Sequence, residues 1–247
     1  MDVAKSQSVV PAQTNTALYA QLHGSGHPIE DILRVQAAYR LACRLFNGRY
    51  RKTERAFICH AVGAASSVAH FERDVDFIVA ALLHAAYDSG QFPDGRFGKA
   101  SETHRALLRA TVGERAESLV ARYQEFDFDT GAPERMAAES PASADDDILF
   151  LALAHEVDDL ADIGLAIAPK HGASIASRVA ACALLARRIG RQALGEAIEA
   201  AAQPYRDTAW VAPLRSQRSH GFRIVANVRA YLRLRRAARS GHGVDVS

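Results

Sequence analysis

Residues 57–88 read FICHAVGAASSVAHFERDVDFIVAALLHAAYD, and we interpret this stretch as two helices joined by a short charged turn. The first predicted helix covers residues 55–71. The second starts near Asp74, whose carboxylate can cap its first turn. Each helix brings one histidine, His60 or His84, into otherwise apolar surroundings. The stretch therefore indicates a chemistry built on imidazole side chains.

The composition is that of a globular protein with a sizeable core. The chain has 247 residues, of which 49% are hydrophobic and 23% are charged. The net charge of +2 is too small to indicate nucleic acid as a partner. Cys43, Cys59 and Cys182 are widely spaced in apolar patterns, which is typical of free thiols in a reducing compartment and not of a disulfide framework.

No segment has the pattern of a signal peptide or of a membrane span. The N-terminus lacks the apolar core of a signal peptide. The best membrane candidate, residues 148–168, carries one histidine and four carboxylates, which hydrocarbon would not tolerate. We therefore expect a cytoplasmic protein without a membrane partner.

Apolar residues at helical spacing predict an all-α protein, and we find no strand pattern and no internal repeat. We predict a single helical bundle with a helical C-terminal extension. Its parts are a flexible N-terminal arm over 1–26, a helical domain over 27–170 and the extension over 171–247. Besides the two central helices, we expect helices at 29–46, 101–110, 113–124, 147–166, 173–202 and 219–239. Residues 126–144 are predicted as a long loop.

The predicted final helix over 219–239 is rich in arginine and also carries apolar residues at helical spacing. A basic helix can meet the phosphates of nucleic acid or a membrane surface, or it can be a solvated face. The apolar residues favour a docked amphipathic helix. We therefore predict packing or homo-oligomerisation through the C-terminal helices over nucleic-acid binding.

Three predicted helices each offer one histidine from an apolar environment, namely His60, His84 and His155. Imidazole is the commonest protein ligand for metals such as zinc and iron. Three protein ligands with an open position for water are the usual plan of a hydrolytic metal site. Taken singly, a histidine on a buried face is more often a core residue with satisfied hydrogen bonds than a ligand.

The three histidines occur in an ordered set of segments. RKTERAFICH contains Arg51 and His60, with an aromatic residue three positions before the histidine. ALLHAAYDS contains His84 and Asp88, which are four positions apart and therefore share one face of the predicted helix. LFLALAHEVDDL contains His155. Over roughly residues 51–162 this order resembles the HD-domain superfamily, and most closely the hydrolase domain of the RelA/SpoT alarmone enzymes.

The resemblance implies a metal-dependent hydrolase that acts on a small phosphorylated or nucleotide-like substrate. It implies that His60, His84 and His155 hold a divalent metal, which lowers the pKa of a bound water. Asp88 falls where the family has a glutamate, so it is the candidate general base. Arg51 corresponds to an arginine near the nucleotide and could bind a phosphate.

The chain also departs from that family's pattern. Ala85 replaces the aspartate of the His-Asp pair, and Ser89 replaces the next acid. His155 stands in place of the closing aspartate, unless the register slips to Asp158 or Asp159. A metal here would see mostly neutral imidazoles, which favours zinc or iron over manganese.

Each of the remaining candidates also has a plain structural interpretation. Asp88 could be a solvated carboxylate at a helix end, and Arg51 a solvated loop arginine. Asp158 and Asp159 could orient a ligand histidine by bonding to the ring nitrogen that does not face the metal, or they could form a solvated helix face. His104 is a possible additional ligand of the kind that oxygenase relatives of the superfamily carry.

Three functions therefore stay open from the sequence. The first is a divergent HD-domain phosphohydrolase. The second, motivated by Ala85 and His155, is a degenerate scaffold that has lost catalysis and serves in binding or assembly. The third is an iron-dependent oxygenase or lyase of specialised metabolism on the same scaffold.

Overall fold

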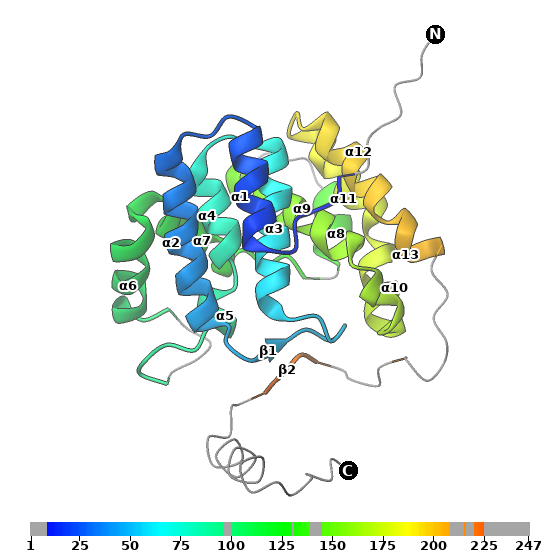
Figure 1. Cartoon of the computed structure of the whole chain (residues 1–247). Helices are drawn as coiled ribbons and strands as arrows, with labels where there is room; N and C mark the ends of the chain where they lie inside the picture. Colours follow the sequence, from blue (N-terminus) through cyan, green and yellow to red (C-terminus); the bar gives the residue numbers. More distant parts are fainter. Residues whose placement is uncertain are drawn as a thin grey trace, which may run out of the picture.

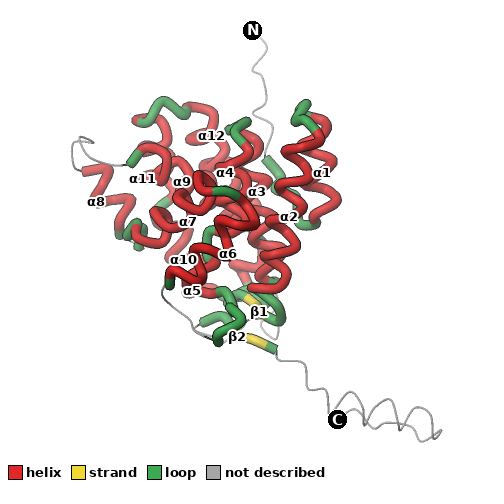
Figure 2. Tube along the Cα trace, turned by 90° about the vertical axis from the view of Figure 1, so that its left-hand side faces the viewer, coloured by secondary structure: helices red, strands yellow, loops and turns green. Residues whose placement is uncertain are grey.

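The fold is that of a helical protein, as Figures 1 and 2 show for a computed structural model of the chain. The structure describes residues 9–95, 100–129, 131–138, 145–207, 215 and 220–224. Helices make up most of this part, which confirms the all-α class. Within the same residues, no helix has the length and apolarity that a membrane span needs.

The described elements follow one another in a chain of mostly short helices. The helices are α1 (Asn15–Gly24), α2 (Ile29–Leu45), α3 (Phe57–Phe71), α4 (Val75–Leu83), α5 (Ala86–Ser89), α6 (Glu102–Val112), α7 (Glu114–Glu125), α8 (Ala132–Ala138), α9 (Asp146–Ala161), η1 (Ile163–Ala166), α10 (Pro169–Ser177), α11 (Val179–Arg188), α12 (Gln192–Ala201) and α13 (Gln203–Asp207). The strands are β1 (Arg49–Tyr50) and β2 (Phe222–Arg223), which pair antiparallel.

Helix α3 lies at the centre of the fold, between α4 on one side and α9 on the other (Figure 1). Every residue from His60 to Ala69 is buried, and most of them are Ala, Gly, Ser or Val. A helix that is apolar on all sides must be covered all round, and small side chains let its neighbours approach closely. The sequence therefore places α3, and with it His60, in the core.

Helix α4 ends earlier than the sequence suggests. Asp74 caps its start by accepting from the Asp76 N–H at 2.9 Å, as predicted. The helix stops at Leu83, because the His84 N–H bonds to the Ala81 carbonyl and tightens the last turn. A separate short helix, α5, then starts at Ala86. The expectation that His84 and Asp88 share one face of a continuous helix is therefore wrong.

The predicted flexible arm over 1–26 contains a docked helix, α1. Leu18 and Leu22 of α1 are fully buried in the main core. Gln21 donates from Nε2 to the Ser66 carbonyl of α3 at 2.9 Å and accepts from the Ser66 hydroxyl at 2.5 Å. For residues 15–24 the prediction of flexibility is wrong, because two leucines four positions apart are enough to anchor a helix.

The predicted boundary at residue 170 does not divide the core. Helices α11 and α12 pack on each other and on α9, and Cys182, Leu185 and Ile198 belong to the same buried cluster as the central helices. A buried ion pair adds to this contact, since Arg178 donates to both Glu156 oxygens at 2.9 and 2.7 Å. The predicted loop over 126–144 also contains the helix α8.

The two strands were not expected, because two residues are too short to show an alternating pattern. They join Arg49 to Arg223 and Tyr50 to Phe222, far apart in the sequence. The expected helix over 219–239 is not formed in its described part, residues 220–224, where Phe222 and Arg223 form strand β2 and the other residues are irregular. The rest of the expected helix lies outside the described residues. Homo-oligomerisation through that segment stays a prediction.

We expect Leu22→Ala to destabilise the protein by about 2–5 kcal/mol, because it opens a cavity where α1 meets the core. Leu33→Ala is the matched control, since Leu33 is 54% exposed on α2 and should change stability by about 0.5 kcal/mol or less. Urea unfolding of both variants measures the difference. Equal stabilities would mean that α1 does not contribute to the fold.

Candidate metal centre

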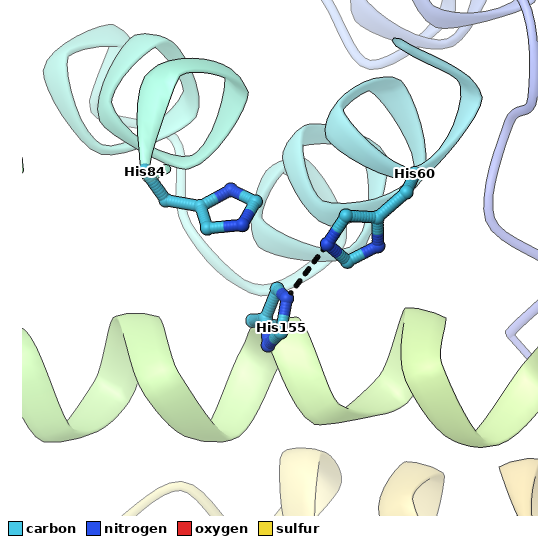
Figure 3. Close-up of side chains that lie close together, drawn as sticks. All are labelled: His60, His84 and His155. Carbon is cyan, nitrogen blue, oxygen red and sulfur yellow. Dashed lines mark hydrogen bonds between the residues drawn. The ribbon is translucent and has the colours of Figure 1, made fainter. Parts of the chain in front are cut away.

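Three histidines from three helices face one another in the core (Figure 3). His60 lies in the first turn of α3, His84 follows the end of α4, and His155 lies in α9. Their ring centroids are 5.1 Å (His60–His84), 4.8 Å (His60–His155) and 4.7 Å (His84–His155) apart. One ring nitrogen from each lies within 4.8 Å of the others, so a single ion could reach all three.

A hydrogen bond fixes the tautomer of His84. Its Nδ1 lies 2.8 Å from the Ala81 carbonyl oxygen, which can only accept, so Nδ1 carries the proton and Nε2 is left for a ligand. His60 Nδ1 lies 2.8 Å from Asp158 Oδ2 and also 2.8 Å from Arg51 Nη1. These two neighbours hold the His60 ring in place, with its Nε2 toward His155.

His155 completes the arrangement through its Nε2, which lies 3.0 Å from His60 Nε2. Two imidazole nitrogens bound to one tetrahedral zinc, at the usual bond length of about 2.0–2.1 Å, would lie about 3.3 Å apart. The observed separation is close to that value.

Burial keeps all three imidazoles neutral. It is the largest cause that lowers the pKa of His60, His84 and His155 below the ordinary value, well below it for His60 and His155. The nearby Arg51 cation lowers the pKa of His60 further. A neutral imidazole is the form that binds a metal, so these residues are in the ligand state near neutral pH.

Two buried ion pairs lie directly behind the histidines. Arg55 donates to both oxygens of Asp158 at 3.0 and 2.8 Å, and Arg51 donates to both oxygens of Asp159. Asp158 and Asp159 are 1% and 3% exposed, so the alternative of a solvated acidic face is wrong. Asp158 orients His60, which is the supporting role that the sequence suggested for it.

The arginines decide the charge state of these carboxylates. Burial raises the pKa of Asp158, and the ion pair with Arg55 opposes that effect. Burial would also raise the pKa of Asp159, but Arg51 and the neighbouring histidines outweigh it and hold the pKa well below its ordinary value. Asp159 is therefore a carboxylate held by Arg51, and a poor proton acceptor.

Gly63 makes room for Asp158 against α3. A Cβ at this position would overlap the Asp158 carboxylate and come within 2.8 Å of Arg55 Nη2. Gly63 lies one turn after His60, so the missing side chain leaves the space in which Asp158 reaches the His60 ring.

The described residues contain three groups of side chains with metal-binding geometry. Besides the three histidines, these are His60, Asp158 and Asp159, and His155, Glu156 and Asp159. The carboxylates of the last two groups are held by arginines, so a metal there would have to compete with ion pairs. The three-histidine group has its Nε2 atoms free of such pairs and is the best-suited donor set.

The other candidate residues named from the sequence do not join the three histidines as a fourth member of that group. Asp88 is exposed on α5 and accepts from Gln124 Nε2 at 2.8 Å, which matches the plain interpretation and not a general base beside the histidines. Arg51 is not a solvated loop arginine, because its guanidinium is paired with Asp159 and lies 2.8 Å from His60 Nδ1. His104 bonds to Asp94 at 2.9 Å and stacks on Phe92, so it does not join the three histidines.

The structure adds two residues that the sequence analysis missed. Arg55 is one, and it pairs with Asp158 and, at 3.7 Å, with Asp162. Its position close to His60 in the sequence was the available signal. Tyr123 is the other, with its ring centroid 5.6 Å from that of His84. It helps to line a cavity of about 10 Å³ beside His84 and His155, and burial raises the pKa of its hydroxyl.

Comparison with known proteins gives one partial match. Residues 44–127 match a family model described as a domain of unknown function (DUF6817). The matched part includes His60 and His84 but ends before His155. No curated protein matches the chain. The resemblance to the HD-domain superfamily therefore stays a prediction.

We expect the metal-free protein to lose stability as the pH falls from about 7 to about 5. The unfolded chain takes up a proton on each histidine near its ordinary pKa of about 6.5, whereas the folded chain does not. Each buried imidazole can then contribute up to about 1.4 kcal/mol of lost stability per pH unit below that value.

Urea unfolding of chelator-treated protein across this range measures the slope. His84→Gln should flatten it, because glutamine does not titrate. A slope that is the same in the wild type and in His60→Gln, His84→Gln and His155→Gln would contradict the assignment of neutral buried rings.

Proposed function

We propose that this protein is a divergent metal-dependent hydrolase that acts on a small phosphorylated or nucleotide-like substrate. The observation that carries the proposal is the convergence of His60, His84 and His155 from three separate helices (Figure 3). The His84 ring is held by its hydrogen bond to the Ala81 carbonyl in the tautomer that leaves Nε2 for a metal. The His60 ring is held in place by Asp158 and Arg51.

The donor set fits a zinc or iron ion better than manganese. All three candidate ligands are neutral imidazoles, whereas manganese and magnesium favour carboxylates. A divalent metal held by three protein ligands supplies a Lewis acid and lowers the pKa of coordinated water.

The charges around the histidines favour an anionic substrate. Arg51 and Arg55 pair with Asp159 and Asp158, so the two carboxylates nearest the histidines are compensated and do little to offset a dipositive ion. A phosphate group brings the opposite charge and is attracted to such a centre. The negative charge of a phosphate-bearing substrate would therefore balance the positive charge of the bound ion.

Asp88 does not enter the proposal, because it is exposed and bonds to Gln124. The residues behind the histidines act by positioning. Asp158 and the Ala81 carbonyl hold the rings of His60 and His84, and Arg55 holds Asp158. Each keeps a ligand nitrogen directed at the common point.

Two other functions use the same geometry. A scaffold without catalysis is favoured by Ala85, because the side chain after His84 offers no carboxylate ligand. An iron-dependent oxygenase or lyase is compatible with three neutral ligands, which leave several coordination positions open. Oxygen uptake that requires ferrous iron would separate this function from hydrolysis.

We expect the protein purified without chelators to contain about one zinc or iron ion per chain, as three histidine ligands allow. Elemental analysis measures this content. The double variant His60→Ala/His84→Ala should lose the ion, while His70→Ala, exposed near the end of α3, should keep it. The wild type should also release phosphate from members of a panel of phosphoesters, and His84→Ala should not.

These measurements, together with oxygen uptake, separate the three functions. Metal content that survives the double variant would rule out this centre. Stoichiometric metal without turnover of any phosphoester and without iron-dependent oxygen uptake would favour the scaffold. Phosphate release that persists in His84→Ala would place catalysis elsewhere.

We expect Asp158→Asn to weaken metal binding by about 10–100-fold, because the neutral amide loses the ion pair with Arg55 and holds the His60 ring less firmly. Asp147→Asn is the control with the same chemical change, on an exposed side chain in the first turn of α9. Titration of metal-free protein with zinc in the presence of a competing chelator gives both affinities. Equal values would mean that Asp158 serves the fold alone.

A further inference from the structure

A second concave region lies next to the histidines. It is a cavity of about 370 Å³, within the range of small-molecule sites. Its walls come from residues 49–52 around strand β1, from Phe57 at the start of α3, from His171 of α10 and from residues 220–221 before strand β2. Segments that are far apart in the sequence therefore build one pocket.

The pocket carries positive charge that its own lining does not neutralise. Its lining residues include Arg49, Arg51 and Lys52, and no carboxylate. Arg51 is paired with Asp159, but in the described part of the chain neither Arg49 nor Lys52 forms an ion pair with a carboxylate. Arg49 also donates from Nη1 to the Ser89 carbonyl at 3.0 Å, which leaves its charge uncompensated. Two cationic side chains thus line a concave space whose lining contains no carboxylate.

The titration of neighbouring groups is consistent with this excess of positive charge. Burial lowers the pKa of His171, and Lys52 and Arg51 lower it further although Asp159 opposes them. Burial also lowers the pKa of Arg49, with the Arg223 cation as the second cause. An anion in the pocket would relieve the repulsion among these groups.

Aromatic rings supply the other part of the lining. Tyr50 stacks on Phe222 with ring centroids 5.0 Å apart and an angle of 8° between the planes. Phe57 lies between the pocket and the histidines, with its centroid 5.4 Å from that of His60 and 6.3 Å from that of His84. The pocket therefore combines cations with flat apolar faces and adjoins the candidate metal centre.

We propose that this pocket binds a small soluble phosphate-bearing ligand, with Arg49, Lys52 and His171 toward the phosphate and Tyr50 and Phe57 against its organic part. The inference rests on the proposed function in one respect, since it assigns the substrate subsite of the same centre. Arg51 links the two, because it lines the pocket and lies 2.8 Å from His60 Nδ1. Phosphate binding by the pocket itself does not require the metal.

The segment 220–224 is an integral wall of this site. Ile224 donates its N–H to the Gly48 carbonyl at 2.7 Å, and Gly48 has a φ of +67°, which favours glycine. A Cβ at Gly221 would lie 2.5 Å from the Tyr50 carbonyl oxygen, so a side chain there would push this segment away from β1. Gly221→Val should therefore weaken ligand binding without touching a cationic residue.

The test is calorimetric titration of the metal-free full chain with inorganic pyrophosphate. We expect Lys52→Gln to weaken binding by about tenfold or more, as the loss of a charge-assisted hydrogen bond does. Lys170→Gln is the matched control, since Lys170 is exposed on α10 and lies outside the pocket lining. Unfolding curves of all variants verify that they fold alike.

The results distinguish this inference from the proposed hydrolase. Pyrophosphate binding that persists in His84→Ala, which removes a proposed metal ligand, would support the pocket even if no phosphoester is hydrolysed. Absence of binding in the wild type, or equal affinities of Lys52→Gln and Lys170→Gln, would overturn the assignment. Co-sedimentation with phosphatidylglycerol vesicles that depends on Lys52 would also overturn it, in favour of a lipid headgroup.

Discussion

The pairing of Asp158 and Asp159 with Arg55 and Arg51 is the interaction on which the rest of the centre depends. Burying two carboxylates is costly unless each is paired and hydrogen-bonded, and removal of one partner from such a pair costs about 3–5 kcal/mol. The two arginines precede α3 and the two aspartates lie in α9, so the pairs join the entry of the central helix to its main neighbour. The same contacts bring His60 and His155 face to face. Fold and ligand geometry are therefore set by one group of charges.

This arrangement separates two layers of charge. The inner layer consists of neutral imidazoles, because burial disfavours their protonated forms. The next layer holds the acids, already balanced by arginines. Beyond them, Arg49 and Lys52 face the pocket without a carboxylate in its lining. We infer that the charge of the surrounding side chains becomes more positive from the histidines to the pocket. An anionic ligand would enter from the pocket side.

The sequence predicted the parts of this structure that depend on local patterns. The apolar stretches at 57–71 and 75–83 became α3 and α4, and the separate helix with His155 became α9. One wrong prediction and one missed feature have the same cause, because both depend on more than the neighbouring residues in the sequence. The spacing of His84 and Asp88 indicates one face only if the helix continues, and a tightened turn at His84 interrupts it. The pairing of β1 with β2 joins residues more than 170 positions apart, which no local pattern can show.

The structure also shows the surroundings of the two residues, Ala85 and His155, that depart from the expected ligand pattern. Ala85 lies in the turn between α4 and α5, so the carboxylate expected beside His84 is absent. His155 lies with its Nε2 3.0 Å from that of His60. With an alanine at position 85 and a histidine at position 155, the three side chains that face one another are all imidazoles. Gly63 leaves space for the Asp158 carboxylate behind His60, where Arg55 pairs with it. A cation at this group would therefore meet neutral donors first, because the nearest carboxylates are already held by arginines.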